Sequence, residues 1–244
     1  MFSNRYIFIY STILVVVVAA VLAFAATALK PNQDQNIRID RIQNLLKAAD
    51  IESTKENAEE LYSTYVKEEL AVDSLGNIIS RYADGKLEGE VRPFDINLKE
   101  QQHLRKKGNN AVVPIYVLKK DGETSYILPM LGNGLWGAVS GNIALGEDFN
   151  TVIGVTFDHA GETPGLGAEI VLKDFRDRFT DKQLFKGNDF VSITIKKRAN
   201  QKSLHEVDAL SGGTVTCEGV SNMLKDNLSF YQGFKKQLGK HIAE

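Results

Sequence analysis

The chain has 244 residues, of which 43% are hydrophobic and 25% are charged, and its formal net charge is −2. This composition supports a buried core and has no overall basic character, so nucleic acid is not expected as a partner. The single cysteine, Cys217, excludes an intramolecular disulfide, a structural zinc site built from cysteine pairs and a thiolate-held iron–sulfur cluster. The four histidines are widely separated, so no metal site is predicted.

The first thirty residues differ from the rest of the chain. No charged residue occurs between Arg5 and Lys30, and residues 7–29 are almost wholly aliphatic, aromatic or alanine. A hydrocarbon core about 30 Å thick needs about 20 helical residues, so this segment is predicted to be one transmembrane helix. A secretory signal is the alternative, because Ala26-Thr27-Ala28 has the form of a cleavage site, but the apolar core of such signals is shorter, about 7–15 residues. We favour a retained helix.

The charges beside this span do not determine its orientation. Arg5 precedes the span, whereas Lys30, Arg38 and Arg41 follow it. This bias does not favour export, yet long domains translocate largely regardless of charge. The charge pattern alone therefore leaves the sidedness open.

Residues 31–110 are predicted to be a juxtamembrane helical and connecting region. A polar exit at residues 31–35 is followed by apolar residues at helical spacing over 37–51 and, among glutamates that indicate a solvated face, over 58–70. Residues 85–110 contain Pro93 and a basic cluster and are typical of a loop or a strand edge.

The pattern changes to short β-rich runs beyond residue 111. Four such runs, separated by Gly, Asp and Asn, occupy residues 112–118, 125–130, 137–145 and 152–157. A hairpin turn is predicted at residues 118–122 and a further strand at 190–195. Helical spacing of apolar residues recurs over 168–179 and over 220–238. The predicted fold class is α+β, an antiparallel sheet with packed helices, preceded by one N-terminal transmembrane helix. The predicted domain boundaries are 1–30, 31–110 and 111–244.

Two glycine-rich stretches interrupt the predicted sheet region. The first, residues 132–137, contains the only tryptophan, Trp136, which serves either as a core residue at a tight corner or as a flat platform for a ligand. The second, residues 162–167, precedes the helical run at 168–179 and could bind an anion. It lacks the full dinucleotide fingerprint, and no Walker sequence occurs, so neither a Rossmann site nor an ATP-driven machine is predicted.

A run of hydroxyl and glycine residues, Ser211 to Thr216, lies at the start of the last predicted helix. The first backbone N–H groups of a helix lack intrahelical partners and carry partial positive charge, so an anionic group near Thr214 or Thr216 would be stabilised. Taken alone, the run is more often an ordinary N-cap after a glycine turn.

Three motifs in this order resemble one family. They are Gly134-Leu135-Trp136-Gly137, then His159-Ala160-Gly161-Glu162-Thr163-Pro164-Gly165-Leu166-Gly167-Ala168-Glu169-Ile170, and then Asp208-Ala209-Leu210-Ser211-Gly212-Gly213-Thr214-Val215-Thr216. The chain resembles the membrane-anchored FMN-binding proteins. Within them it looks like the C-type subunit of the bacterial sodium-translocating NADH:quinone oxidoreductase and, less closely, like the G-type subunit of the ferredoxin-linked Rnf complex.

The resemblance implies a covalently attached cofactor. In the family, a flavin transferase that uses FAD joins FMN by a phosphoester bond to the last threonine of an Asp-x-x-Ser-Gly-Ala-Thr pattern, which is Thr214 in this chain. Gly213 stands where the family usually has alanine. By the same resemblance, Ser211, Gly212, Gly213 and Thr216 line the phosphate end. The residues implied near the rest of the flavin are Trp136, Glu162, Thr163, Leu166 and Gly167.

The family resemblance also implies a function. FMN on Thr214 would relay electrons from NADH toward quinone in a sodium-translocating complex, with other membrane subunits as partners and no catalytic residue in this chain. The expected location is the bacterial inner membrane, with a single pass through residues 7–29 and a periplasmic domain. The alternatives are an Rnf-type electron carrier and a membrane-tethered assembly protein without a redox role.

Overall fold

The structure is a computed structural model that describes residues 3–241 and the side chains of residues 3–238. The chain divides into two compact units, Met1–Arg41 and Ile42–Glu244. The fold class predicted from the sequence, a mixed helix and antiparallel-sheet fold with one long apolar N-terminal helix, is confirmed.

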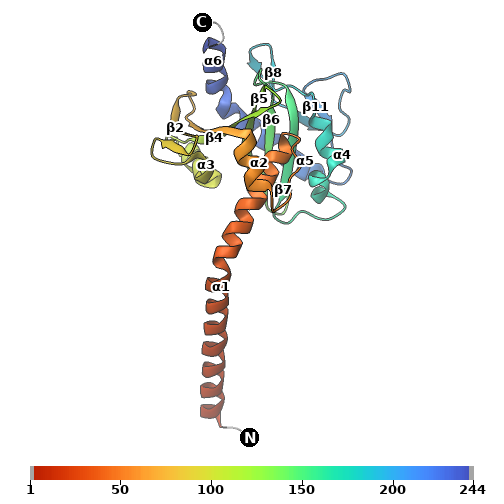
Figure 1. The fold of residues 1–244 in the computed structure, drawn as a ribbon. Helices are drawn as coiled ribbons and strands as arrows, with labels where there is room; N and C mark the ends of the chain where they lie inside the picture. Colours follow the sequence, from red (N-terminus) through yellow and green to blue (C-terminus); the bar gives the residue numbers. More distant parts are fainter. Residues whose placement is uncertain (1–2, 242–244) are drawn as a thin grey trace. The chain divides into compact units, whose positions relative to one another are not determined.

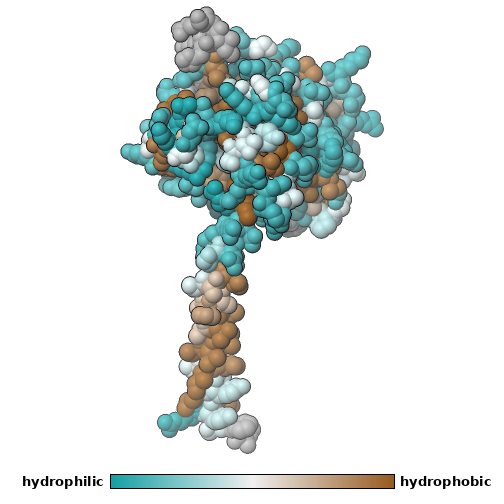
Figure 2. All heavy atoms as spheres, in the orientation of Figure 1, coloured by the Kyte–Doolittle hydropathy of each residue, from teal (hydrophilic) through white to brown (hydrophobic). Residues whose placement is uncertain are grey.

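The first unit is formed by helix α1 (Asn4–Ala48), whose last residues belong to the second unit (Figure 1). An 18-residue window of α1 has a mean hydropathy of 2.8, and none of that window is buried, so its length and composition suit a membrane span. Figure 2 shows this part of the chain as predominantly hydrophobic. Residues 37–48 are helical as predicted, but they continue α1 through Pro31 instead of forming a separate helix.

The second unit is built on a seven-stranded sheet in the order β3-β2-β1-β4-β5-β6-β7. Every neighbouring pair in this sheet is antiparallel. The strands are β1 (Val66–Val72), β2 (Ile78–Ala83), β3 (Lys86–Glu88), β4 (Val113–Lys120), β5 (Glu123–Asn133), β6 (Ala138–Leu145) and β7 (Val152–His159). The last four coincide with the four runs predicted from the sequence.

The predicted helix over residues 58–70 is wrong in its second half. Helix α2 (Ala58–Tyr65) ends where β1 begins, because β1 lies between β2 and β4 and both neighbours satisfy its backbone hydrogen bonds. Glu69, which the pattern placed on a solvated face, is buried instead. Its carboxylate accepts bonds from the Arg92 guanidinium at 2.6 Å and from the Tyr62 hydroxyl at 3.0 Å. This ion pair makes burial of the charge tolerable.

The segment at residues 85–110, predicted as a loop or a strand edge, does contain an edge strand of the sheet and also has helical structure that was not predicted. It includes β3, the 3₁₀ turn η1 (Pro93–Asp95) and helix α3 (Leu98–Lys106). Asn97 caps α3, since its Oδ1 accepts from the backbone N–H groups of Lys99 and Glu100 at 3.1 and 3.4 Å. The polar sequence of α3, which buries none of its residues, has no apolar stripe to reveal it.

Helix α5 (Thr214–Leu228) packs against β5 and buries Val220, Met223, Leu224 and Leu228. The 3₁₀ turn η4 (Ser229–Tyr231) and helix α6 (Gln232–His241) complete the predicted C-terminal helix. The region predicted as one helix at 168–179 is instead three short pieces, η2 (Gly167–Val171), α4 (Lys173–Arg176) and η3 (Asp177–Phe179). Phe175 and Phe179 pack on Phe157 of β7, so they still contribute to the core.

Two small strand pairs lie outside the main sheet. They are the antiparallel pair β8 (Phe185–Lys186) and β9 (Asp189–Phe190), and the parallel pair β10 (Thr194–Lys196) and β11 (Glu206–Asp208). The single strand predicted at residues 190–195 is divided between β9 and β10, because Ser192 adopts a positive φ of 61°. Strand β11 leads directly toward the start of α5.

Candidate cofactor-attachment site

The turn before α5 presents a threonine at the first helical position. Gly212 has a φ of +74°, which favours glycine, and Gly213 occupies the N-cap position without any side-chain capping bond. Thr214 is the first residue of α5 and is exposed, as is Ser211. The alternative in which these hydroxyls form an ordinary N-cap is therefore wrong.

The N-terminus of α5 is open to an anionic group. The first backbone bond that closes the helix runs from Cys217 N to Gly213 O at 2.8 Å. Among the residues that the structure describes, the N–H groups of Thr214, Val215 and Thr216 have no hydrogen-bond acceptor. Unpaired N–H groups and the helix dipole favour negative charge at such a position. A phosphate ester on Thr214 is chemically compatible with this end of the helix.

The Thr216 side chain points to a different partner. Thr216 is 2% exposed, and its Oγ1 donates a hydrogen bond to Oε2 of Glu162, which is 4% exposed. The Thr216 hydroxyl is therefore occupied within the protein, and only its backbone N–H remains available to a phosphate. Of the two threonines predicted at the phosphate end, Thr214 alone presents an exposed hydroxyl.

Glu162 connects the three motifs. Its Oε1 accepts from the backbone N–H of Trp136 at 2.9 Å, its Oε2 accepts from Thr216, and its own N–H donates to Nδ1 of His159 at 3.2 Å. Burial acts to raise the pKa of Glu162, but the hydrogen bonds from Thr216, Trp136 and the Leu135 backbone outweigh burial and lower this pKa below its ordinary value. Glu162 is thus held as an anion whose two oxygens are used by the protein.

The glycine loop at residues 162–167 contacts the turn before α5 and the first turn of that helix through positions that have no room for a side chain. A Cβ atom on Gly167 would overlap Thr216 Oγ1 and would lie 2.7 Å from Glu162 Oε2. A Cβ atom on Gly212 would overlap the Leu166 side chain. The loop at residues 162–167 therefore lies directly against the turn that carries Thr214. Thr163 belongs to this loop, and its carbonyl accepts from the N–H groups of Leu166 and Ala168 at 3.1 Å each.

Large apolar side chains are exposed around this turn. Trp136 is 69% exposed, so the alternative in which it is a core residue is wrong. Leu135, Leu166 and Val215 are exposed as well, and they come from the same two loops and from the first turn of α5. Exposed apolar residues gathered in this way are typical of a surface that binds a ligand, a membrane or another protein.

Sequence reasoning misses two of these residues. Leu135 and Val215 lie next to Trp136 and Thr214 in the chain, yet neither is among the predicted site residues. The sequence feature that could have identified them is a large apolar residue at a position where no core is predicted. Leu135 is such a residue inside a glycine turn, and Val215 is one within the hydroxyl run. His159 is half-buried, and its ring accepts a hydrogen bond from the backbone N–H of Glu162.

The geometry brings together every residue predicted at the site, although with different roles. Thr214 and Ser211 are exposed at the turn, Gly212 and Gly213 shape it, and Leu166 and Trp136 present apolar surface. Glu162, Gly167 and Thr216 form the buried polar support beneath. Within residues 3–241, no group of three or more His, Cys, Asp or Glu side chains is placed to hold a metal ion.

Comparison of the sequence with known protein families identifies the class of protein to which this chain belongs. Residues 134–229 match the FMN-binding domain family, and this stretch contains all three motifs. The chain therefore falls in the class of proteins with an FMN-binding domain. It is 33% identical over 218 residues to the C-type subunit (NqrC) of the Na⁺-translocating NADH-quinone reductase from Haemophilus ducreyi, a match that covers 87% of this chain and 85% of the relative. The corresponding subunit from Vibrio parahaemolyticus is 32% identical over 84% of this chain and 82% of its own length.

Solved structures give the same result. A crystal structure of the same reductase subunit from Parabacteroides distasonis superposes with a TM-score of 0.73 at 32% identity, covering 85% of this chain and 96% of that chain. Shewanella oneidensis NqrC superposes with a TM-score of 0.67 at 25% identity, covering 84% of this chain and 99% of that one. The chain belongs to the NqrC family of Na⁺-translocating NADH-quinone reductase subunits.

Proposed function

We propose that this chain is a membrane-anchored flavoprotein subunit of a Na⁺-translocating NADH-quinone reductase, with FMN attached covalently to Thr214. The observation that carries the proposal is the exposed Thr214 hydroxyl at a helix N-terminus whose first three N–H groups lack acceptors within the described chain. The FMN-binding domain match and the NqrC relatives support the choice of ligand and complex. Helix α1 supplies a candidate anchor.

The surroundings of Thr214 suit an FMN phosphoester. The free N–H groups of Thr214, Val215 and Thr216 offer donors to phosphate oxygens, and the helix dipole stabilises the remaining negative charge. Trp136, Leu135, Leu166 and Val215 offer apolar surface to a flavin ring system. When bound, FMN supplies the electron-transfer chemistry, and these residues hold and shield it.

Attachment of FMN requires FAD as the donor in this proposal. The Thr214 Oγ forms a bond to the phosphorus of the FMN half, and the bond from that phosphorus to the bridging oxygen of the diphosphate breaks. AMP leaves with this oxygen, and the hydroxyl proton passes to solvent. A flavin transferase is the partner that carries out this transfer. A covalent tether prevents loss of the cofactor.

The test is FMN attachment to matched threonine variants made in cells that contain the transferase. We expect the wild type and Thr214→Ser to give a fluorescent band after denaturing electrophoresis, and Thr214→Val to give none. Thr216→Val is the control, since its hydroxyl faces Glu162 and is not the acceptor; its Tm should fall while the band remains. Mass spectrometry of the peptide with both threonines locates the adduct. An unchanged band in Thr214→Val would reject Thr214 as the acceptor.

We further propose that the second unit faces the periplasm and that attached FMN passes electrons between neighbouring redox centres of the complex. The support is the relationship to NqrC, because the charges beside α1 do not define the orientation. Protease added to intact spheroplasts should degrade the second unit. Protection in spheroplasts with degradation after lysis would place it in the cytoplasm instead.

A further inference from the structure

One surface loop beside the attachment turn has a strong local charge. The segment at residues 196–202, here called the basic loop, contains Lys196, Lys197, Arg198 and Lys202, and no acidic residue occurs from 195 to 205. The whole chain has a net charge of −2, so the remaining residues together carry −6 (−2 − 4 = −6). The basic loop therefore concentrates positive charge on a chain whose other residues are net acidic.

The basic loop is fixed to the segment that leads to Thr214. It connects the parallel strands β10 and β11, whose last pair is Lys196 with Asp208. The backbone N–H of Ala209 donates to Lys196 O at 2.8 Å, and Ile195 N donates to Ser221 Oγ of α5 at 2.8 Å. The loop thus begins at the point where the chain leaves β11 for the turn at residues 209–213.

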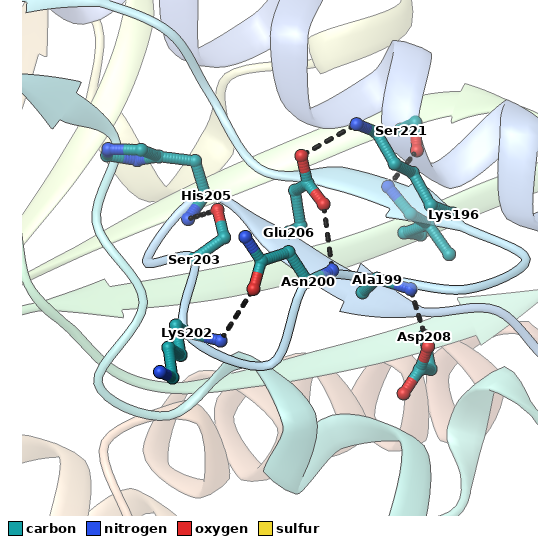
Figure 3. Close-up of polar contacts among 10 residues, drawn as sticks. Lys196, Ala199, Asn200, Lys202, Ser203, His205, Glu206, Asp208 and Ser221 are labelled. Atoms are coloured by element: carbon teal, nitrogen blue, oxygen red, sulfur yellow. Dashed lines mark hydrogen bonds and ion pairs between the residues drawn. The ribbon is translucent and has the colours of Figure 1, made fainter.

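Two carboxylates hold the basic loop in one conformation, as Figure 3 shows for the contact of Asp208 with Ala199 and that of Glu206 with Asn200. Asp208 accepts from Ala199 N at 2.7 Å and from Gln201 Nε2 at 2.6 Å. Glu206 accepts from Asn200 N at 3.0 Å and from Lys196 Nζ at 2.6 Å.

These contacts explain the first residue of the attachment motif. Asp208 starts the Asp-x-x-Ser-Gly-x-Thr pattern, yet its side chain faces the basic loop and contacts no residue of the turn that carries Thr214 among the described side chains. The backbone N–H of Ala199 and the Gln201 amide lower the pKa of Asp208. The backbone N–H of Asn200 and the Lys196 ammonium lower the pKa of Glu206. Both carboxylates therefore stay ionised and are occupied by the loop.

The remaining cations of the loop are unpaired. Lys197 and Arg198 are exposed, and within residues 3–241 neither side chain has a hydrogen-bond or ion-pair partner. Two further cations stabilise the same region through backbone carbonyls, since Arg178 donates to Asp208 O at 2.9 Å and Lys182 donates to Ser203 O at 2.8 Å. Within residues 195–208, four cations outnumber two carboxylates, so this segment is net positive.

We propose that the basic loop is the docking surface for an acidic face of the flavin transferase that modifies Thr214. This inference rests on the proposed attachment of FMN to Thr214. An enzyme that reaches the exposed Thr214 hydroxyl must cover the turn at 209–213, and the loop bonded to Ala209 is then at the edge of the covered area. Charge complementarity at an interface edge speeds association and orients the partner.

The fixed loop conformation favours this role. Ordering flexible lysine and arginine side chains opposes binding, and a backbone already held by Asp208 and Glu206 reduces the ordering that remains. In this view Asp208 is a positioning residue: its carboxylate contacts the basic loop and sets where Lys197 and Arg198 are presented. The acidic motif residue and the basic loop are then two parts of one recognition element.

The test measures the initial rate of FMN attachment to the full chain in detergent, with purified transferase and FAD. The variant Lys197→Glu/Arg198→Glu should slow attachment about tenfold or more at about 0.05 M salt, through a higher KM for this chain. The difference in attachment rate between the wild type and this variant should be smaller at about 0.5 M salt, because the salt screens the charges. The control Lys67→Glu/Lys86→Glu changes the net charge equally at exposed positions on β1 and β3 and should keep the wild-type rate.

The outcomes separate this inference from the proposed function. Absence of FMN on the wild type would overturn both proposals. Equal rates for the wild type and the loop variant would overturn the docking surface and leave Thr214 attachment standing. If the loop variant raised the KM for FAD and left the KM for this chain unchanged, the docking surface would also be overturned, because the loop would then contact the donor. Equal Tm values of the two double variants before attachment would exclude misfolding as the cause of a slower rate.

Discussion

On the two sides of the proposed attachment site, polar and apolar residues are distributed in the reverse of the usual way. Beneath the turn, the polar side chains of Glu162 and Thr216 are almost fully buried and bonded to each other. Above it, the tryptophan and three aliphatic side chains are exposed. Burying a charge is costly unless it is hydrogen-bonded, and exposing large apolar surface has no stabilising effect on the chain itself. The buried side serves the fold, whereas the exposed side is the proposed surface for the flavin.

This contrast assigns different observables to the two sides. Substitutions beneath the turn should change the stability of the chain before any flavin is attached. Substitutions above it should leave that stability unchanged and alter the attached flavin.

The largest effect on stability is expected for Glu162→Ala. The substitution leaves the Thr216 hydroxyl and the Trp136 N–H without their acceptor, so we expect a loss of about 3 kcal/mol in unfolding free energy. Thermal or urea unfolding of the flavin-free chain measures it. Glu147→Ala is the control, because Glu147 is exposed and has no hydrogen bond within the described chain. Equal losses in both variants would show that Glu162 does not join the loops.

A smaller loss, of about 2 kcal/mol, is expected for Gly167→Ala, because the new methyl group would overlap Thr216 Oγ1 and crowd Glu162. Gly161→Ala in the same loop is the matched control, since a Cβ atom there meets nothing within 4 Å. A Tm decrease of roughly 4–8 °C for Gly167→Ala alone would fit the expected loss. Similar Tm values for the two variants would mean that the loop is not closed against α5.

The charge on Glu162 predicts a pH dependence. Its pKa is lower in the folded chain than in the unfolded chain, where a glutamate titrates near about 4.3, so its contribution to stability is complete above that pH. On acidification the unfolded chain binds the proton first, and the contribution is lost as the pH falls through the folded pKa. The stability difference between wild type and Glu162→Gln should therefore shrink below about pH 4.5. A difference that stays constant down to about pH 3 would contradict an ionised Glu162.

The outcome of sequence reasoning differs between these two sides. The hydroxyl run, both glycine loops and the strands β4 to β7 were predictable, because turns, hydroxyls and alternating apolar residues are local signals. The hydrogen bond between Glu162 and Thr216 could not be predicted, because 54 residues separate the two in the sequence and each residue alone is of a type usually found at the surface. The same limit applies to Glu69, whose burial depends on Arg92. Helix α3 was missed because it buries none of its residues and has no apolar stripe.

Above the turn, Trp136→Ala should change stability by no more than about 0.5 kcal/mol in the flavin-free chain, since the indole is mostly exposed. Its effect should appear in the loaded protein, where loss of the neighbouring indole is expected to raise flavin fluorescence. Trp136 is the only tryptophan, so its own emission reports the same contact and should be quenched when FMN is attached. Unquenched emission in the loaded wild type would separate the indole from the flavin.

The smallest effect is expected for Gly213→Ala, which introduces the residue that the family usually has at this position. Gly213 has a φ of −100°, which alanine adopts freely, and a Cβ atom there would lie 3.3 Å from Leu210 Cβ and 3.4 Å from Leu166 O. The tight contact opposes the gain of about 0.4–1 kcal/mol that a less flexible unfolded chain provides, so the net change should stay within about 0.5 kcal/mol. The variant should accept FMN at the wild-type rate.

Gly212→Ala is the contrasting variant. The positive φ of Gly212 and the overlap of a new Cβ atom with Leu166 should lower both the stability of the chain and the rate of FMN attachment. Equal behaviour of the two variants would show that the turn tolerates either backbone shape, and that its conformation does not govern access to Thr214.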